Sequence, residues 1–207
     1  MINTVIFDFD GTLADSLLVI WQVADELLVE NKRPKLTTSQ QQMIKSHSPR
    51  EILANFHILL LMIPILLAKG KSKMSSHIEK ISPVAGMKPV LKILQQKGIK
   101  LGLLSSNSLS NIQLFLKNNQ MEMFDFVASE SNLFGKDKAL KKLINKYQLE
   151  KESLIYVGDE VRDIEACRKI SLSIISVTWG LNSKERLRQE KPNYLINKPE
   201  EILRLFE

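Results

Sequence analysis

The chain has little of what would indicate a secreted or membrane protein. It holds one cysteine, Cys167, among 207 residues, which excludes an internal disulfide and suits a reducing compartment. Its longest apolar run, residues 58–68, contains Pro64 and is far shorter than the roughly 20 residues that span a bilayer. The first residues lack the basic segment and cleavage site of a signal peptide. We therefore expect a cytoplasmic protein with no membrane partner.

The charge pattern does not indicate a nucleic-acid partner. Lys and Arg total 29 against 23 Asp and Glu, a net charge of +6, but the lysines are spread along the chain without a recognition motif. The three histidines show no metal-ligand spacing. We interpret the excess charge as a solvated lysine surface whose positive field would help an anionic substrate to approach.

The pattern of apolar residues predicts an α/β fold. Residues 4–9 form an apolar run without polar alternation, as expected of a strand covered on both faces. Strands alternating with helices predict a doubly wound, Rossmann-like parallel sheet. The other predicted strands are 100–104, 124–128, 154–157 and 174–177, and the predicted helices beyond residue 83 are 88–97, 109–118, 136–147, 163–169 and 200–206.

Between the first strand and residue 83 the chain is mainly helical. We expect a helix over 17–30, a short helix to Lys45 capped by Thr37 or Thr38, a helix from Pro49 towards residue 68 with a bend at Pro64, and a short helix over 72–80. The prediction is a small helical insert, residues 16–82, within a core of residues 1–15 and 83–207. Residues 58–68 would form its core; if exposed, they would indicate dimerisation or an apolar substrate tail. Monomer and homodimer both stay open.

Polar residues follow the predicted strands, where parallel sheets bind their ligands. Gly135 lets the chain turn so that Lys136, rather than Lys138, points inward. The residues at these positions are Asp8 and Asp10 after the first strand, Ser105, Ser106 and Asn107 after the second, Lys136 at a helix start, and Asp159 and Asp163 after residues 154–157.

The carboxylates in this set suit phosphoryl transfer. Asp8 can accept a phosphoryl group as an aspartyl-phosphate. Asp10 can protonate the leaving oxygen and then activate water, provided that the neighbouring acids raise its pKa. A divalent cation must offset the repulsion between carboxylates and phosphate, and Mg²⁺ prefers oxygen ligands. Asp8 and Asp159 are the expected direct ligands, and Asp163 would hold a metal-bound water.

The remaining polar residues complete a phosphate site. The hydroxyl and backbone N–H groups at Ser105 and Ser106 can hold phosphate oxygens, with Asn107 beside them. Lys136 supplies a positive charge for the phosphate and for Asp8. Arg50, at the start of a helix in the insert, is a candidate for the distal part of the substrate.

These residues, in this order, resemble the haloacid dehalogenase (HAD) superfamily of phosphatases over nearly the whole chain. The resemblance implies Asp8 as nucleophile, Asp10 as acid/base with its backbone carbonyl on Mg²⁺, Thr12 in the same phosphate-binding motif, and Ser105, Lys136, Asp159 and Asp163 in the later motifs. The insert resembles the family's helical C1 cap. Ala85-Gly86 and Val177-Thr178-Trp179-Gly180 resemble the phosphoglycolate-phosphatase-like branch, although Asp137 and Glu160 replace its usual residues beside Lys136 and Asp159.

The expected function is a Mg²⁺-dependent phosphomonoester hydrolase acting on a small phosphorylated metabolite, either phosphoglycolate-like or a sugar phosphate. A phosphomutase with the same core is the alternative enzyme, and a non-catalytic scaffold is the alternative of another class. Dehalogenase chemistry does not use a protonated Asp at position 10 and is disfavoured. Phosphonate cleavage would require a Schiff-base lysine in the insert, for which Lys45 is a remote candidate.

Overall fold

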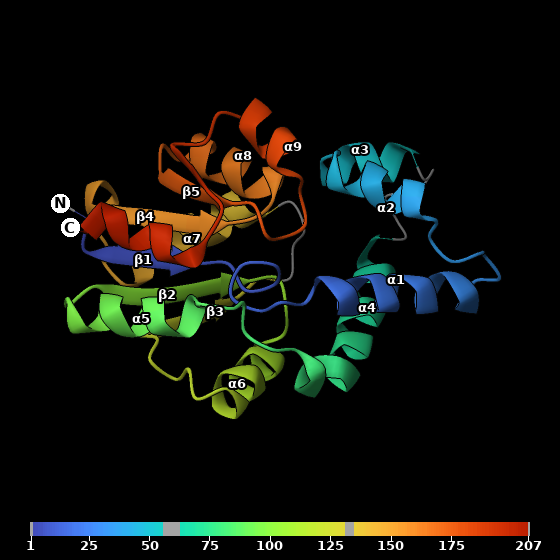
Figure 1. Cartoon of the computed structure of the whole chain (residues 1–207), viewed down its shortest axis with the longest axis horizontal. Coiled ribbons are helices and arrows are strands. Elements are labelled where there is room, and N and C mark those ends of the chain that lie inside the picture. The colour runs from blue at the N-terminus through green and yellow to red at the C-terminus, as the bar shows by residue number, and fades with distance from the viewer. Residues whose placement is uncertain (1, 56–62, 131–134, 207) are drawn as a thin grey trace.

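In the computed structural model, which describes residues 2–55, 63–130 and 135–206, a six-stranded parallel sheet forms the centre of the molecule (Figure 1). The strand order is β3-β2-β1-β4-β5-β6. Because β1 lies between β2 and β4, the strand order reverses beside it, and ligands bind at such points in doubly wound sheets. The strands are β1 (Thr4–Phe7), β2 (Lys100–Ser105), β3 (Phe126–Ser129), β4 (Leu154–Gly158), β5 (Ser173–Val177) and β6 (Tyr194–Ile196).

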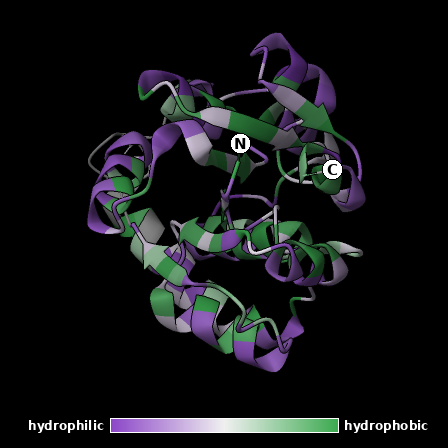
Figure 2. Ribbon diagram, turned by 90° about the vertical axis from the view of Figure 1, so that its left-hand side faces the viewer, coloured by the Kyte–Doolittle hydropathy of each residue, from purple (hydrophilic) through white to green (hydrophobic). Residues whose placement is uncertain are grey.

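Helices cover both faces of the sheet, which explains why β1 lacks polar alternation. Val5 and Phe7 pack in one apolar cluster with α5 and α6, whereas Ile6 packs in a second cluster with α7 and α8. The helices alternate hydrophobic and hydrophilic residues along their length, as amphipathic helices do (Figure 2). The helical segments of this part are α5 (Met87–Gln96), α6 (Leu109–Asn118), α7 (Lys136–Lys146), η3 (Lys151–Ser153), α8 (Val161–Lys169), α9 (Lys184–Gln189) and the 3₁₀ segment η4 (Pro199–Phe206).

The predicted helical insert lies beyond the carboxyl ends of the strands (Figure 1). The two connections to it run side by side: the Asp15 N–H donates to the Ser82 carbonyl at 2.9 Å, and the Val84 N–H donates to the Leu13 carbonyl at 2.9 Å. These connections hold the helices over the edge of the sheet where β1 ends. The insert comprises α1 (Leu17–Glu30), α2 (Thr38–Lys45), α3 (Pro49–Asn55), α4 (Ile63–His77) and η2 (Ile78–Lys80).

Most of the predicted helices and strands are confirmed by the observed elements. Thr37 caps α2, with its side chain accepting from the Gln40 N–H. The separate helix predicted over 72–80 is wrong, because α4 is continuous from Ile63 to His77. The predicted bend at Pro64 adjoins residues 56–62, which lie outside the described residues, and stays a prediction. The predictions for residues 56–62, including the first five residues of the apolar run, fall outside the described residues.

The other differences concern short elements. Sequence patterns missed α9 and β6, the strands predicted over 4–9 and 124–128 are shorter, and the last predicted helix is a 3₁₀ segment. Such short elements contain too few residues to show a periodicity. Within the described part of the chain, none of the helices has the length and apolarity to cross a membrane.

Candidate active site

Three aspartates converge at the carboxyl edge of β1 and β4. Asp8 follows β1, Asp159 follows β4, and Asp163 lies in the first turn of α8. Each offers a carboxylate oxygen, these oxygens lie within 4.8 Å of one another, and all three side chains are buried. A buried set of hard oxygen donors matches what Mg²⁺ requires, so the residues present fit this ion.

Lys136 lies between two of these carboxylates. Its ammonium donates to Asp8 Oδ2 at 2.7 Å and also to Asp163 Oδ1, and lies 5.3 Å from the centre of the Tyr156 ring. Burial lowers the pKa of Lys136, but the charges of Asp163 and Asp8 outweigh this effect, so its pKa lies above the ordinary value. The amine is therefore a permanent cation beside Asp8. The structure thus brings Lys136, and not the exposed Lys138, into the site.

Asp8 is held in one orientation. Its Oδ1 accepts the Phe9 N–H at 2.8 Å while Oδ2 accepts from Lys136. Burial raises the pKa of Asp8, the Lys136 charge opposes that rise, and the nearby Asp163 adds to it. A bound Mg²⁺ would add to the positive charge of Lys136 and would favour the ionised forms of these carboxylates.

Asp10 has the environment of a proton donor near neutral pH. Burial, followed by the charge of Asp8, raises the pKa of Asp10 to about 6. The Asn107 amide donates to Asp10 Oδ2 at 3.1 Å, and the side chains of Ser16 and Asn107 both oppose the rise in the pKa of Asp10. Asp10 Oδ1 has no hydrogen bond of good geometry among the described residues, with Ser16 the polar side chain beside the carboxyl group.

Asp159 is the most tightly surrounded carboxylate. Its Oδ1 accepts the Thr12 hydroxyl at 2.9 Å, and its Oδ2 accepts the Leu181 N–H at 2.7 Å. A Cβ atom at Gly11 or Gly180 would lie 2.3 or 2.2 Å from Asp159 Oδ2, so glycine is required at both positions. The Thr12 hydroxyl thus orients the Asp159 carboxylate, and the phosphate-binding role of Thr12 stays a prediction.

Ser105, Ser106 and Asn107 lie at the end of β2 and directly after it. Ser105 is buried, and its Oγ accepts the Asn107 N–H at 2.9 Å. Ser106 lines the cavity in front of Asp10. Asn107 also lines that cavity, but its amide group bonds to Asp10, to the Ser108 N–H and to the Asn111 amide. The Asn107 amide thus positions Asp10, and its phosphate-binding role stays a prediction.

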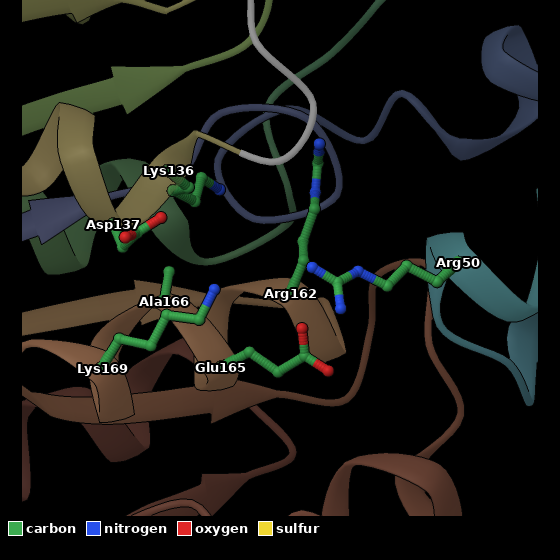
Figure 3. A pocket seen from close by; sticks show the side chains of 7 residues that line it. All are labelled: Arg50, Lys136, Asp137, Arg162, Glu165, Ala166 and Lys169. Atoms are coloured by element: carbon green, nitrogen blue, oxygen red, sulfur yellow. The ribbon is translucent and has the colours of Figure 1, made fainter. Parts of the chain in front are cut away.

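Arg50 does not line the cavity in front of Asp10. It extends from α3 towards Arg162 and Glu165 on α8, where these residues line a small pocket with Lys136 (Figure 3). The pocket that Arg50 lines includes Lys136, and a contact of Arg50 with the distal part of the substrate stays a prediction.

Sequence patterns missed Asn182, which connects the insert to the aspartate loop, the segment from Asp159 to Asp163. Its Oδ1 accepts the Val161 N–H at 2.8 Å at the start of α8, and its Nδ2 donates to the carbonyls of Lys45 and His47 at 3.1 Å each. The neighbouring Ser183 N–H donates to the Lys45 carbonyl at 2.8 Å. No local motif marks an asparagine whose partners lie up to 137 residues away.

A partly buried ion pair that no sequence pattern indicated lies beside Asp159. The Arg162 guanidinium donates to Glu160 Oε1 at 2.6 Å, and both residues face the cavity beside Asp159. Burial raises the pKa of Glu160, and the Arg162 charge opposes this rise. The pair therefore brings little net charge to the cavity.

Comparisons with known proteins agree with this geometry. Residues 5–177 match the family described as haloacid dehalogenase-like hydrolase. A phosphoglycolate phosphatase of Synechococcus elongatus is 29% identical over 202 residues, covering 97% of this chain and 95% of the relative. A pyrophosphatase PpaX of Listeria welshimeri is 22% identical over 98% of this chain and 95% of its own. A predicted phosphatase from Clostridium acetobutylicum has a TM-score of 0.86 at 20% identity, covering 100% of this chain and 98% of that structure. The chain belongs to the haloacid dehalogenase-like hydrolases.

Proposed function

We propose that this hydrolase is a phosphatase that cleaves small phosphomonoesters through an aspartyl-phosphate on Asp8. The observation that carries the proposal is the position of Asp8 at the end of β1, 2.7 Å from the Lys136 ammonium and beside Asp159 and Asp163. A buried carboxylate with a fixed cation at one oxygen is suited to attack an anionic phosphorus centre. In this proposal residues 16–82 form a cap over a core of residues 1–15 and 83–207.

In the first step, an Asp8 oxygen attacks phosphorus and the bond between phosphorus and the ester oxygen breaks. Asp10 donates a proton to that oxygen, which leaves as an alcohol. A pKa of about 6 keeps part of Asp10 protonated near neutral pH while leaving its conjugate base competent for the second step. The Lys136 ammonium and the groups at Ser105 and Ser106 hold the phosphoryl oxygens in this proposal.

In the second step, ionised Asp10 takes a proton from a water molecule, which attacks the phosphorus. The Asp8–phosphorus bond breaks, releasing inorganic phosphate and restoring the Asp8 carboxylate. Asp8, Asp159 and Asp163 would hold Mg²⁺, which when bound supplies positive charge that offsets the repulsion between these carboxylates and the phosphate. Thr12 and Asn107 keep Asp159 and Asp10 in place.

The test compares Asp8→Asn with Asp15→Asn, the same substitution on an exposed residue of the same connection. Phosphate release is measured with methyl phosphate, phosphoglycolate and pyrophosphate, the last two suggested by the names of the relatives, with MgCl₂ and with EDTA. We expect Asp8→Asn to lower kcat by about a thousandfold or more and Asp15→Asn to leave it within about twofold. Equal activity of Asp8→Asn and the wild type would overturn the proposal.

A further inference from the structure

A cavity of about 400 Å³ separates the catalytic edge of the sheet from the helices of the insert. This volume is within the roughly 300–1,000 Å³ typical of small-molecule sites. Asp10 and Ser106 lie at one end of the cavity, so whatever occupies it is next to the proposed reaction centre.

The wall opposite the catalytic residues is apolar. Among the described residues of the insert, Lys71 is the one charged side chain that lines the cavity. Burial lowers the pKa of Lys71, which the charge of Glu130 partly opposes. The remaining lining residues of the insert are Leu17, Ile20, Val23, Ala24 and Leu27 from α1, Pro49, Ile52 and Leu53 from α3, and Leu66, Gly70 and Met74 from α4.

The wall is shared between the cavity and the packed interior, because Val23 and Met74 also belong to a buried apolar cluster against which Ile20 and Leu27 pack. The α1 residues recur every three or four positions, which places them on one face of the helix, and that face borders the cavity. An apolar face that lines a cavity next to the catalytic residues favours an apolar group on the ligand, since burial of each methylene contributes about fourfold in affinity.

The charges in the cavity disfavour a second anionic group on the substrate. At the catalytic end, the Arg162 charge is paired with Glu160 at 2.6 Å, and Asp10 and Asp159 would repel an anion. Against the apolar wall, a carboxylate or second phosphate would lose its hydration, and among the described insert residues that line the cavity only Lys71 would offer it a charge. The cavity therefore suits an ester with one phosphate and an uncharged body.

We propose that the substrate is a phosphomonoester with an apolar body, either a short alkyl or an aryl phosphate, that places its phosphate at Asp8 and its body against α1, α3 and α4. This assignment rests on the proposed phosphatase activity. Hydrolysis converts the ester and one water into inorganic phosphate and an apolar alcohol or phenol, which leaves through the same cavity.

The first test measures kcat/KM of the wild type for n-alkyl phosphates from methyl to hexyl, for phosphoglycolate and for pyrophosphate, with MgCl₂. We expect kcat/KM to rise up to about fourfold per methylene until the cavity is filled, and hexyl phosphate to exceed phosphoglycolate at least about tenfold. A higher value for phosphoglycolate or pyrophosphate than for every alkyl phosphate would overturn the apolar assignment while leaving the phosphatase activity intact. Absence of turnover on all of these compounds would instead overturn the phosphatase proposal.

The second test places bulk in the wall. Ala24→Phe fills the cavity from α1, and Val29→Phe adds a ring to a side chain of the same helix that is 53% exposed. We expect Ala24→Phe to lower the ratio of kcat/KM for hexyl phosphate to that for methyl phosphate about tenfold or more, and Val29→Phe to leave the ratio unchanged. Circular dichroism checks that both variants fold. An unchanged ratio in a folded Ala24→Phe variant would contradict the proposed position of the substrate body.

Discussion

Replacing Lys136 with methionine would remove the cation from the active site while keeping most of the side chain's volume. In the native protein the ammonium bonds to Asp8 at 2.7 Å and to Asp163, and the lysine and both carboxylate side chains are almost fully buried. The methionine side chain would keep the packing near Tyr156 but would leave two buried carboxylates without their partner.

The expected loss of stability follows from this burial. Removing one member of a buried ion pair costs about 3–5 kcal/mol, because the remaining charge has lost its hydration and gained nothing. For a protein of this size, about 1 kcal/mol corresponds to roughly 2–4 °C in Tm, so a 3 kcal/mol loss predicts a decrease of roughly 6–12 °C. The carboxylates can limit the loss by taking up a proton.

Proton uptake gives the effect a defined pH dependence. Burial already raises the pKa of Asp8, and removal of Lys136 takes away the charge that opposes this rise. The folded variant then binds more protons than the unfolded chain, so its free energy of unfolding falls as the pH rises above about 4, the ordinary pKa of Asp. The difference in the free energy of unfolding between the wild type and Lys136→Met should therefore be larger at pH 8 than at pH 5.

The assay is urea unfolding monitored by circular dichroism at pH 5 and pH 8 in EDTA, with phosphatase activity measured in parallel in MgCl₂. The matched control is Lys138→Met, which removes an exposed lysine from the same helix. In addition, MgCl₂ should stabilise Lys136→Met more than the wild type, because a bound cation takes over part of the lost charge. A destabilisation below about 1 kcal/mol at pH 8, or equal effects of the two substitutions, would refute the reasoning.

Two other predictions follow from buried groups outside the proposed chemistry. Asn182→Ala should lower the free energy of unfolding by about 1–3 kcal/mol, because the Val161 N–H and two carbonyls lose their partner. Asn118→Ala, at an exposed position, should change the free energy of unfolding by less than about 0.5 kcal/mol. Urea unfolding measures both variants, and equal values would contradict the connecting role of Asn182. Cys167 should react with iodoacetamide in urea but not in the native protein, because burial raises the pKa of its thiol and prevents the reagent from reaching it. Mass spectrometry detects the labelling, and rapid labelling of the folded chain would contradict the buried position of Cys167.

Much of the fold could be predicted because the relevant signals are local. The apolar run at residues 4–9 predicts a strand covered on both faces, and the helices that cover β1 confirm it. The segment over 72–80 shows the limit of local reasoning, because its pattern predicted a separate short helix, whereas the structure has one continuous helix, α4, from Ile63 to His77.

Local patterns were enough to predict which residues meet at the candidate active site. Asp8, Asp159 and Lys136 follow strands or begin a helix at the carboxyl edge of a parallel sheet, and topology brings such positions together whatever the intervening chain does. Their catalytic roles stay predictions.

The contacts of the neighbouring side chains, in contrast, could not be predicted from the chain and were found in the folded structure. Thr12 and Asn107 lie in the predicted motifs, yet their polar groups bond to Asp159 and Asp10, and Asn182 joins the insert to the aspartate loop across 137 residues. The apolar wall of the cavity likewise combines α1, α3 and α4. The physical reason is that hydrogen bonds and cavities depend on distances between side chains from separate elements, which no local pattern in the chain specifies.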